Sequence, residues 1–379
     1  MKQINLSCEI LKNKFLNPIW LGSGSLADSD EKIRKFLLSE AGAIVPRTTR
    51  LNYAPGRQKH PSYHLDVNTR EKWIRNCEWT GNVIEYWTPY LEKLSKTNRI
   101  IMSVSGRDIA ECLETCKILD KFNFPFLEIN VSCSHSNEAH GFINRNKKHI
   151  QNLVSVLKKE IRTSIVLKLG HSDFIVELAK SAEDAGVDAI VAINTFGPVL
   201  DFDISNGRPE LTLGIKNGKG GLSGRAIFHI ALTDVAELSQ ALKIPIIACG
   251  GVTQAEDAIK MIMAGASAVQ IYSAAHLEGK NAPKFFNKFI DDFKKWIDVH
   301  GYDDVKQLKG ILLPKLLRPD QMNAIIPIWS DKSCTKCGKC INICLEDAID
   351  FTENEVNINS SKCIGCGACV SICPTKSLR

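Results

Sequence analysis

Short runs of β-branched and other apolar residues alternate with longer stretches of helical periodicity through the first 300 residues. This alternation is typical of an α/β fold in which βα units surround a parallel sheet. The apolar runs predict eight strands, near residues 18–21, 43–46, 100–103, 126–130, 164–168, 189–193, 246–249 and 268–271. The helical periodicity predicts helices near residues 31–40, 108–121, 148–161, 174–185, 227–242, 255–264 and 283–300. Eight strands with intervening helices favour a (β/α)8 TIM barrel over an open doubly wound sheet.

The pattern changes after residue 301 and again near residue 331. We expect a barrel over residues 1–301, a connector over 302–330 and a small C-terminal domain over 331–379. The connector is too apolar for a free linker, and we expect it to pack on the barrel. Its most apolar positions are Leu312, Leu313, Leu316 and Leu317.

Composition and charge narrow the class of protein. Of the 379 residues, 44% are hydrophobic and 24% are charged, which are globular proportions. No apolar run approaches the roughly 20 residues of a membrane helix, and the first residues lack the apolar core and cleavage site of a signal peptide, so we expect the cytoplasm. The net charge is +6 without a dense basic block, which argues against nucleic acid. Residues 331–379 carry six basic and six acidic side chains, so the whole excess lies in residues 1–330.

Cysteine is concentrated at the C-terminus, where eight of the 14 cysteines occupy the last 49 residues. They form two identical C-x2-C-x2-C-x3-C runs, which bind [4Fe–4S] clusters in bacterial ferredoxins, with the fourth cysteine of each run binding the other cluster. Disulfides would need an oxidising compartment, and zinc sites usually show separate C-x2-C pairs. We therefore predict a two-cluster, ferredoxin-like domain. Its ligand sets are Cys334, Cys337, Cys340 and Cys373 for one cluster, and Cys363, Cys366, Cys369 and Cys344 for the other.

Polar residues and glycines follow most of the predicted strands. In a barrel of this class the active site lies at the C-terminal ends of the strands, so these residues are the candidates for chemistry. Glycine-rich segments at the ends of strands six, seven and eight are typical of a barrel phosphate site. The relevant segments are GSGSL at 22–26, Arg47 and Thr48, NVSCSH at 130–135, Lys168, Asn194 and Thr195, KGGLSG at 219–224, CGG at 249–251 and YSA at 272–274.

The barrel resembles the FMN-dependent dihydroorotate dehydrogenase and dihydropyrimidine dehydrogenase family. The resemblance covers most of residues 17–300, and with its tail the whole chain is similar to the barrel-plus-ferredoxin subunit of bacterial NAD-dependent dihydropyrimidine dehydrogenases. The membrane class of the family has an N-terminal membrane helix and a serine base, and neither is found here. The resemblance rests on the stretches NPIWLGSGSL, FLEINVSCSH, VLKL, INTFGP, GGLSG and IPIIACGGVTQAEDAIKMIMAGASAVQIYSA.

The resemblance implies FMN as cofactor and assigns roles to individual residues. Cys133 would be the general acid/base that moves a proton at the carbon next to the one that exchanges hydride with the flavin. Substrate contacts would come from Arg47, Asn76, Asn130, His135, Asn194 and Thr195. FMN contacts would come from Gly22, Ser23, Gly24, Arg47, Thr48, Asn130, Lys168, Asn194, Gly221, Ser223, Gly224, Gly250, Gly251, Tyr272 and Ser273. The remaining barrel thiols are interpreted as core or incidental residues: Cys8, Cys77, Cys112, Cys116 and Cys249. Of these, Cys77 and Cys249 are expected to border the site.

The chain departs from the family at the substrate side. Arg47 stands where family members usually have a lysine that touches both FMN and substrate, and Ser134 replaces the usual proline after the cysteine. A planar guanidinium suits a carboxylate, so an orotate-like or another acidic unsaturated substrate stays open beside uracil and thymine. His135 resembles the dihydropyrimidine dehydrogenase version of the motif, and substrate contact and a surface-loop role both stay open.

Three functions follow as hypotheses. The first is an FMN and iron–sulfur oxidoreductase acting on a C–C bond of a dihydropyrimidine-like ring, with electrons passing through two [4Fe–4S] clusters to an FAD/NAD(P)H-binding subunit or a soluble ferredoxin. The second is an ene-reductase for a different acidic or amide-bearing substrate anchored by Arg47. The third is an electron-transfer subunit without substrate chemistry. No G-x-G-x-x-G fingerprint follows a strand near the start of the chain, so we do not expect NAD(P)H to bind here, and the family resemblance implies a homodimer.

Overall fold

The computed structural model describes residues 4–52, 63–66, 68, 73–76, 81–132, 146–209, 211, 218–316, 324–330, 333–352 and 355–379. The chain divides into two compact units, Met1–Lys315 and Leu316–Arg379. The division falls inside the segment 302–330 that was expected to be a connector. None of the helices among the described residues is both long and apolar enough to cross a membrane.

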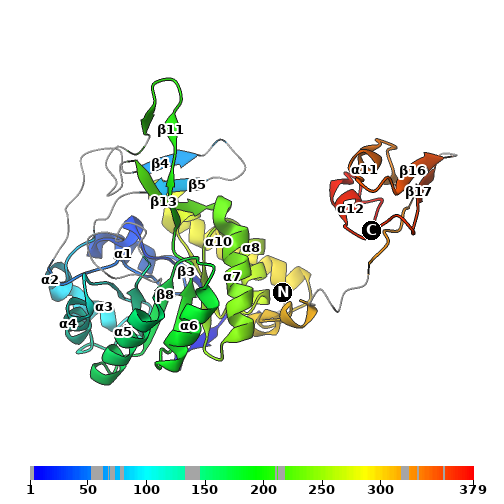
Figure 1. Cartoon of the computed structure of the whole chain (residues 1–379). Coiled ribbons are helices and arrows are strands. Elements are labelled where there is room, and N and C mark those ends of the chain that lie inside the picture. Colours follow the sequence, from blue (N-terminus) through cyan, green and yellow to red (C-terminus); the bar gives the residue numbers. More distant parts are fainter. Residues whose placement is uncertain are drawn as a thin grey trace. The chain divides into compact units, whose positions relative to one another are not determined.

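The first unit is built on a parallel sheet of seven strands (Figure 1). Backbone hydrogen bonds close this sheet into a barrel, because the segment around Ile44 bridges Leu21 on one edge and Ile100 beside the other. Residues 43–46 were expected to form a strand, but they make only these isolated bridges. The prediction of a (β/α)8 barrel is confirmed, with residues 43–46 as the eighth segment of the barrel wall. In sheet order the strands are β3 (Ile19–Leu21), β15 (Ala268–Ile271), β14 (Ile246–Cys249), β9 (Ala189–Ala192), β8 (Ile165–Leu169), β7 (Leu127–Asn130) and β6 (Ser103–Val104).

Helices cover the outside of the barrel, and their bounds agree with the periodicity to within a few residues. Several begin at side-chain caps; for example, the Asp108 carboxylate accepts the backbone N–H of Glu111. The larger helices are α1 (Asp30–Leu37), α4 (Ile109–Leu119), α5 (Lys147–Glu160), α6 (Ile175–Asp184), α7 (Phe228–Ala241), α8 (Ala255–Met263) and α10 (Ala282–Val299). Shorter ones are α2 (Ile84–Trp87), α3 (Leu91–Ser95) and α9 (Ser273–Leu277), with 3-10 turns at η1 (Ser25–Ala27), η2 (Thr88–Tyr90), η3 (Arg225–Ile227), η4 (Gly279–Asn281), η5 (Val305–Leu308) and η6 (Leu313–Lys315).

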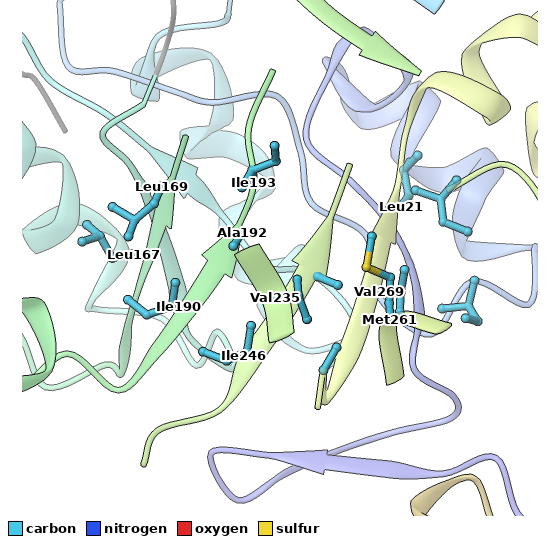
Figure 2. Close-up of a cluster of buried hydrophobic side chains, with 14 of the residues drawn as sticks. Leu21, Leu167, Leu169, Ile190, Ala192, Ile193, Val235, Ile246, Met261 and Val269 are labelled. Atoms are coloured by element: carbon cyan, nitrogen blue, oxygen red, sulfur yellow. The ribbon is translucent and has the colours of Figure 1, made fainter. Parts of the chain in front are cut away.

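Alternation along each strand separates two cores. Residues such as Leu167 and Ile190 point outward and pack against helix residues such as Val235 and Met261 (Figure 2). The intervening residues fill the barrel interior, where the lower layer is apolar and is closed by the hairpin of β1 (Cys8–Ile10) and β2 (Asn13–Phe15). Members of this lower layer are Trp20, Val45, Phe126, Val166, Val191, Ile247 and Ala268.

The next interior layer, toward the C-terminal ends of the strands, is polar. The same alternation places Ser103, Glu128, Lys168, Cys249 and Gln270 there, each two residues after a member of the apolar layer. All but Cys249 are at most 3% exposed. This polar layer separates the apolar core from the pocket described below.

Two long loops add a four-stranded antiparallel sheet that stands above the barrel (Figure 1). The loop after residue 46 supplies two strands, and the loop after β9 supplies the other two. One segment expected as a glycine-rich loop, 219–224, is a strand of this sheet. In order the strands are β10 (Phe196–Leu200), β13 (Lys219–Gly224), β5 (Trp73–Asn76) and β4 (Tyr63–Asp66), and a small hairpin of β11 (Phe202–Asp203) and β12 (Arg208–Pro209) follows β10.

The second unit repeats one short pattern twice. Each cysteine run leads into a short helix, α11 (Lys339–Asn342) or α12 (Ala368–Ile372), and the hairpin of β16 (Ile349–Thr352) and β17 (Glu355–Ile358) lies between the runs. Gly338 and Gly367 precede the two helices with φ of 69° and 74°, a left-handed conformation that glycine adopts without strain. The two helices pack on each other around a small apolar core of Ile349, Val356, Cys369 and Leu378.

Candidate active site

A pocket lies at the C-terminal ends of the barrel strands. Residues from the loops after six of the eight barrel segments line it, together with Asn130 of β7, Lys168 of β8, and Tyr63 and Ile74 from the sheet above. Three cations, Arg47, Arg50 and Lys168, and no carboxylate belong to its described lining. The pocket is therefore built for an anionic or phosphate-bearing ligand.

Most of the site residues predicted from the sequence lie together in this lining. They are Gly22, Ser23, Gly24, Arg47, Thr48, Asn130, Lys168, Asn194, Thr195, Ser223, Gly250, Gly251, Tyr272 and Ser273.

Five predicted residues are not among the described residues of this lining. Cys133 and His135 lie outside the described residues, as does the side chain of Asn76, whose backbone belongs to β5. Gly221 pairs with Asn76 in the upper sheet, and Gly224 precedes η3 with a φ of 91°. Neither glycine is part of the pocket lining.

One wall of the pocket is a hydrogen-bonded amide cluster. Asn194 Nδ2 donates to Asn130 Oδ1 and to Ser132 Oγ, each at 3.1 Å, and Asn130 Nδ2 donates to Thr48 Oγ1 at 3.1 Å. Asn194 Oδ1 accepts the backbone N–H of Thr195. These bonds assign the orientation of both amides, so the wall presents fixed donors and acceptors to a ligand with ring amides.

The floor of the pocket contains a buried charged group. Lys168 Nζ donates to Gln270 Oε1 at 3.0 Å and lies 3.7 Å from Glu128 Oε1, while Gln270 Nε2 donates to Glu128 Oε2 at 2.7 Å. Burial alone would lower the pKa of Lys168, but the neighbouring Cys249 and Glu128 more than offset it, and the pKa is raised. Lys168 is a cation at neutral pH.

Another part of the pocket lining combines the hydroxyls of two serines with glycine turns. Ser273 Oγ donates to Ser223 Oγ at 2.8 Å, and both residues line the pocket beside Gly250 and Gly251. Gly251 has a φ of 72°, and a Cβ there would lie 2.5 Å from the backbone nitrogen of Phe228, where α7 begins. Hydroxyls and a backbone brought close to a helix start form the donor set that suits a phosphate.

The side chain of Tyr272 packs against the loop that follows β3. Its hydroxyl bonds to Ser25 Oγ and to His276 Nδ1, each at 2.8 Å. A Cβ on Gly24 would lie 2.1 Å from the Tyr272 ring, so this close approach requires glycine.

These features fit the flavin mononucleotide that the resemblance implies. The hydroxyl and glycine end would hold its phosphate, and Lys168 together with the first loop would face its ring. When bound, FMN supplies hydride transfer at its ring, which no amino-acid side chain can perform.

The tail cysteines line a separate cavity in the second unit. Its lining includes Cys334, Cys337 and Cys340 of the first run and Cys373 of the second run. Within the described part of the chain no three His, Cys, Asp or Glu side chains converge on a point that suits a single ion. Cysteines arranged around a cavity suit a cluster of several atoms. Of the other four, Cys344 and Cys369 pack in the small core, whereas Cys363 is half-buried and Cys366 is exposed.

The cavity also favours the ionised form of two of its thiols, which is the form that binds metal. Burial opposes ionisation of Cys373, but the backbone N–H of Leu378 and the Thr375 hydroxyl outweigh it and lower the pKa to about 7. The backbone N–H of Lys339 lowers the pKa of Cys337.

Sequence reasoning missed several residues of the barrel pocket. Arg50 is buried and donates from Nε to Ser105 Oγ at 2.8 Å, and both residues line the pocket. Glu128, which is buried beside Lys168 and is not part of the lining, carried a usable signal, because a carboxylate inside the apolar strand FLEIN is as unexpected as the lysine of VLKL. Tyr63 left no signal, since only the tertiary fold brings β4 over the pocket.

Comparison with known proteins agrees with this architecture. The family model described as dihydroorotate dehydrogenase matches residues 5–296, and the model described as 4Fe-4S dicluster domain matches residues 333–377. A protein of Methanocaldococcus jannaschii named dihydroorotate dehydrogenase B (NAD(+)), catalytic subunit, is 31% identical over 301 residues, covering 77% of this chain and 93% of the relative. A protein of Petrotoga mobilis with the same name is 29% identical over 315 residues, covering 82% of this chain and 100% of the relative.

The two family matches cover the two units separately, and the second relative is matched over its whole length while part of this chain has no counterpart in it. The flavin pocket and the cysteine cavity fall within the respective matches. The chain therefore belongs to the dihydroorotate dehydrogenase family, as an FMN and iron–sulfur oxidoreductase that acts on CH–CH bonds.

Proposed function

We propose that the chain interconverts the C–C single bond of a dihydropyrimidine ring and the C=C bond of its oxidised form, in a ring that carries a carboxylate, as dihydroorotate and orotate do. The proposal rests on one observation above all: Arg47 and Arg50 line the same pocket as the amides of Asn130 and Asn194. Amides match the ring N–H and C=O groups, and a guanidinium matches a carboxylate through its planar fork. The names of the relatives support the same substrate class.

Oxidation of such a ring removes a hydride from one carbon and a proton from its neighbour. We propose Cys133 as the group that takes the proton, since a thiol with a pKa near 8.5 serves either direction near neutral pH. The two electrons would then leave singly through the clusters of the tail. Their acceptor would be an FAD/NAD(P)H-binding subunit or a soluble ferredoxin, which fits the word "subunit" in the names of the relatives.

The ligand sets of the clusters are part of the proposal. Cys334, Cys337, Cys340 and Cys373 would hold one cluster, as their shared cavity supports. By the symmetry of the two runs Cys363, Cys366, Cys369 and Cys344 would hold the other.

The decisive test measures the rates at which dihydroorotate, dihydrouracil and dihydrothymine are oxidised in the presence of an artificial electron acceptor. We expect dihydroorotate to be oxidised fastest, and Arg47→Lys to raise KM for it while FMN stays bound. Arg34→Lys, on the surface of α1, is the matched control. Equal rates on all three substrates, or an Arg47→Lys enzyme with unchanged KM, would contradict the carboxylate anchor. Turnover of none of them by the FMN-loaded enzyme would favour an ene-reductase for another acidic substrate.

A second test separates catalysis from electron relay. Cys133→Ala should slow substrate turnover by roughly 100-fold or more, whereas Cys112→Ala, a buried thiol on α4, should not. An undiminished rate in Cys133→Ala would remove this residue from the mechanism.

A further inference from the structure

Glu128 and Gln270 are buried polar side chains that the proposed substrate chemistry does not use. Glu128 is 0% and Gln270 is 2% exposed, and they come from β7 and β15, on opposite sides of β8 in the barrel sheet. A buried carboxylate is costly unless it is paired and hydrogen-bonded. Its presence in the polar layer of the barrel therefore needs a reason.

Every polar atom of this pair has a partner. Glu128 Oε2 accepts from Gln270 Nε2, and Glu128 Oε1 accepts from Ser103 Oγ at 3.2 Å and faces Lys168 Nζ. Gln270 Oε1 accepts from Lys168 Nζ. Gln270 thus touches both ions and holds them at their separation, while Ser103 continues the chain of bonds to Thr48 on the pocket wall at 2.9 Å.

The charges that face Lys168 come from two elements in the described part of the chain. Glu128 lies on β7 and the Cys249 thiol lies at the end of β14, whereas Gln270 and Ser103 are neutral. Burial raises the pKa of the Cys249 thiol, while the Lys168 charge beside it acts in the opposite direction. Glu128 is the carboxylate that pairs with Lys168 among the described residues, with Oε1 at 3.7 Å from Nζ.

We propose that Glu128 and Gln270 are positioning residues that keep Lys168 a permanent cation at the flavin pocket and so fix the number of protons taken up when the bound flavin is reduced. The inference rests on the FMN site and not on the identity of the substrate. With Lys168 always charged, two electrons and one proton convert the neutral oxidised ring into its reduced anion. Without the Glu128 charge, buried Lys168 loses its proton beside the neutral ring and regains it beside the anion, so that two protons accompany two electrons.

The test is the pH dependence of the midpoint potential of bound FMN in Glu128→Gln, measured by spectroelectrochemistry across the neutral range. We expect the slope of potential against pH to double relative to the unmodified protein, because proton uptake per two electrons doubles. Glu111→Gln is the matched control: it removes another buried carboxylate, on α4, and should leave the slope unchanged. An unchanged slope in FMN-loaded Glu128→Gln would overturn the proposal, as would a doubled slope in the control.

A second measurement applies even where the variant does not retain FMN. In the flavin-free chain, Glu128→Gln and Lys168→Met should each lower Tm, because each leaves one buried ion without its partner. The double variant removes both ions and should recover most of that loss. Losses that simply add in the double variant would show that the two charges are not coupled. Neither readout depends on turnover, so both stand apart from the substrate assays.

Discussion

Gly251 offers the sharpest test of how the fold builds the flavin pocket. Its φ is 72°, and a Cβ would lie 2.4 Å from Cα and 2.5 Å from the backbone nitrogen of Phe228. Both are backbone atoms at the start of α7, so no side chain can rotate away. Gly251→Ala therefore combines left-handed strain, roughly 1–2 kcal/mol, with overpacking of roughly 1–3 kcal/mol.

The matched control is Gly279→Ala. Gly279 also has a left-handed φ, of 55°, but nothing lies within 4 Å of its added Cβ. Unfolding entropy of about 2.1 cal/mol/K per residue gives the first unit about 0.7 kcal/mol/K, so 1 kcal/mol moves Tm by about 1.5 °C. We expect Tm to fall by about 1.5–3 °C in Gly279→Ala and by about 3–8 °C in Gly251→Ala.

FMN binding separates the two variants further. Displacing Phe228 moves η3 and the Ser223 hydroxyl beside it, so Gly251→Ala should weaken FMN roughly tenfold, about 1.4 kcal/mol. Gly279→Ala should keep the original affinity. Scanning calorimetry of the flavin-free chain and fluorescence titration with FMN measure the two effects. Equal Tm losses and equal affinities in the two variants would refute the close contact with Phe228.

Further predictions concern the clusters and the loop after β14. Cys373→Ser should remove the cluster held in the first-run cavity and Cys344→Ser the other, so each halves the iron content, as measured by iron analysis. Alkylation of Cys373 in the cluster-free chain should reach half its limiting rate near pH 7, because the pKa of this thiol is lowered to about 7. Since this pKa is lower in the folded than in the unfolded chain, ionisation of Cys373 stabilises the folded, cluster-free chain as the pH rises above about 7, and this stabilisation is lost below pH 7. Asp257→Asn should lower stability by roughly 3–5 kcal/mol in thermal unfolding, because the carboxylate is 0% exposed, accepts the Thr253 N–H and pairs with Arg225 at 2.5 Å.

The elements nearest the barrel core were the most predictable from the sequence. The bounds of β14 and β15 agree with the prediction because both are short apolar runs between a helix and a glycine or tyrosine turn. The upper sheet was not predicted, since it is joined through β5 and β13, which lie more than 100 residues apart in the sequence. For the same reason the pairing of Gly221 with Asn76 was not predicted, although the motif that contains Gly221 is visible in the sequence.

Alternation and spacing along the chain therefore determined the barrel, the two cysteine runs and most of the residues that surround the flavin pocket, because these depend on local periodicity and on the rule that strand ends meet. Only the tertiary structure decided which of these residues touch. The register of β7, β8 and β15 places Glu128 and Gln270 around Lys168, and the sheet formed by β4, β5, β13 and β10 brings Tyr63 to the pocket. Contacts between distant segments depend on closing the chain into one packed arrangement, which no local pattern encodes.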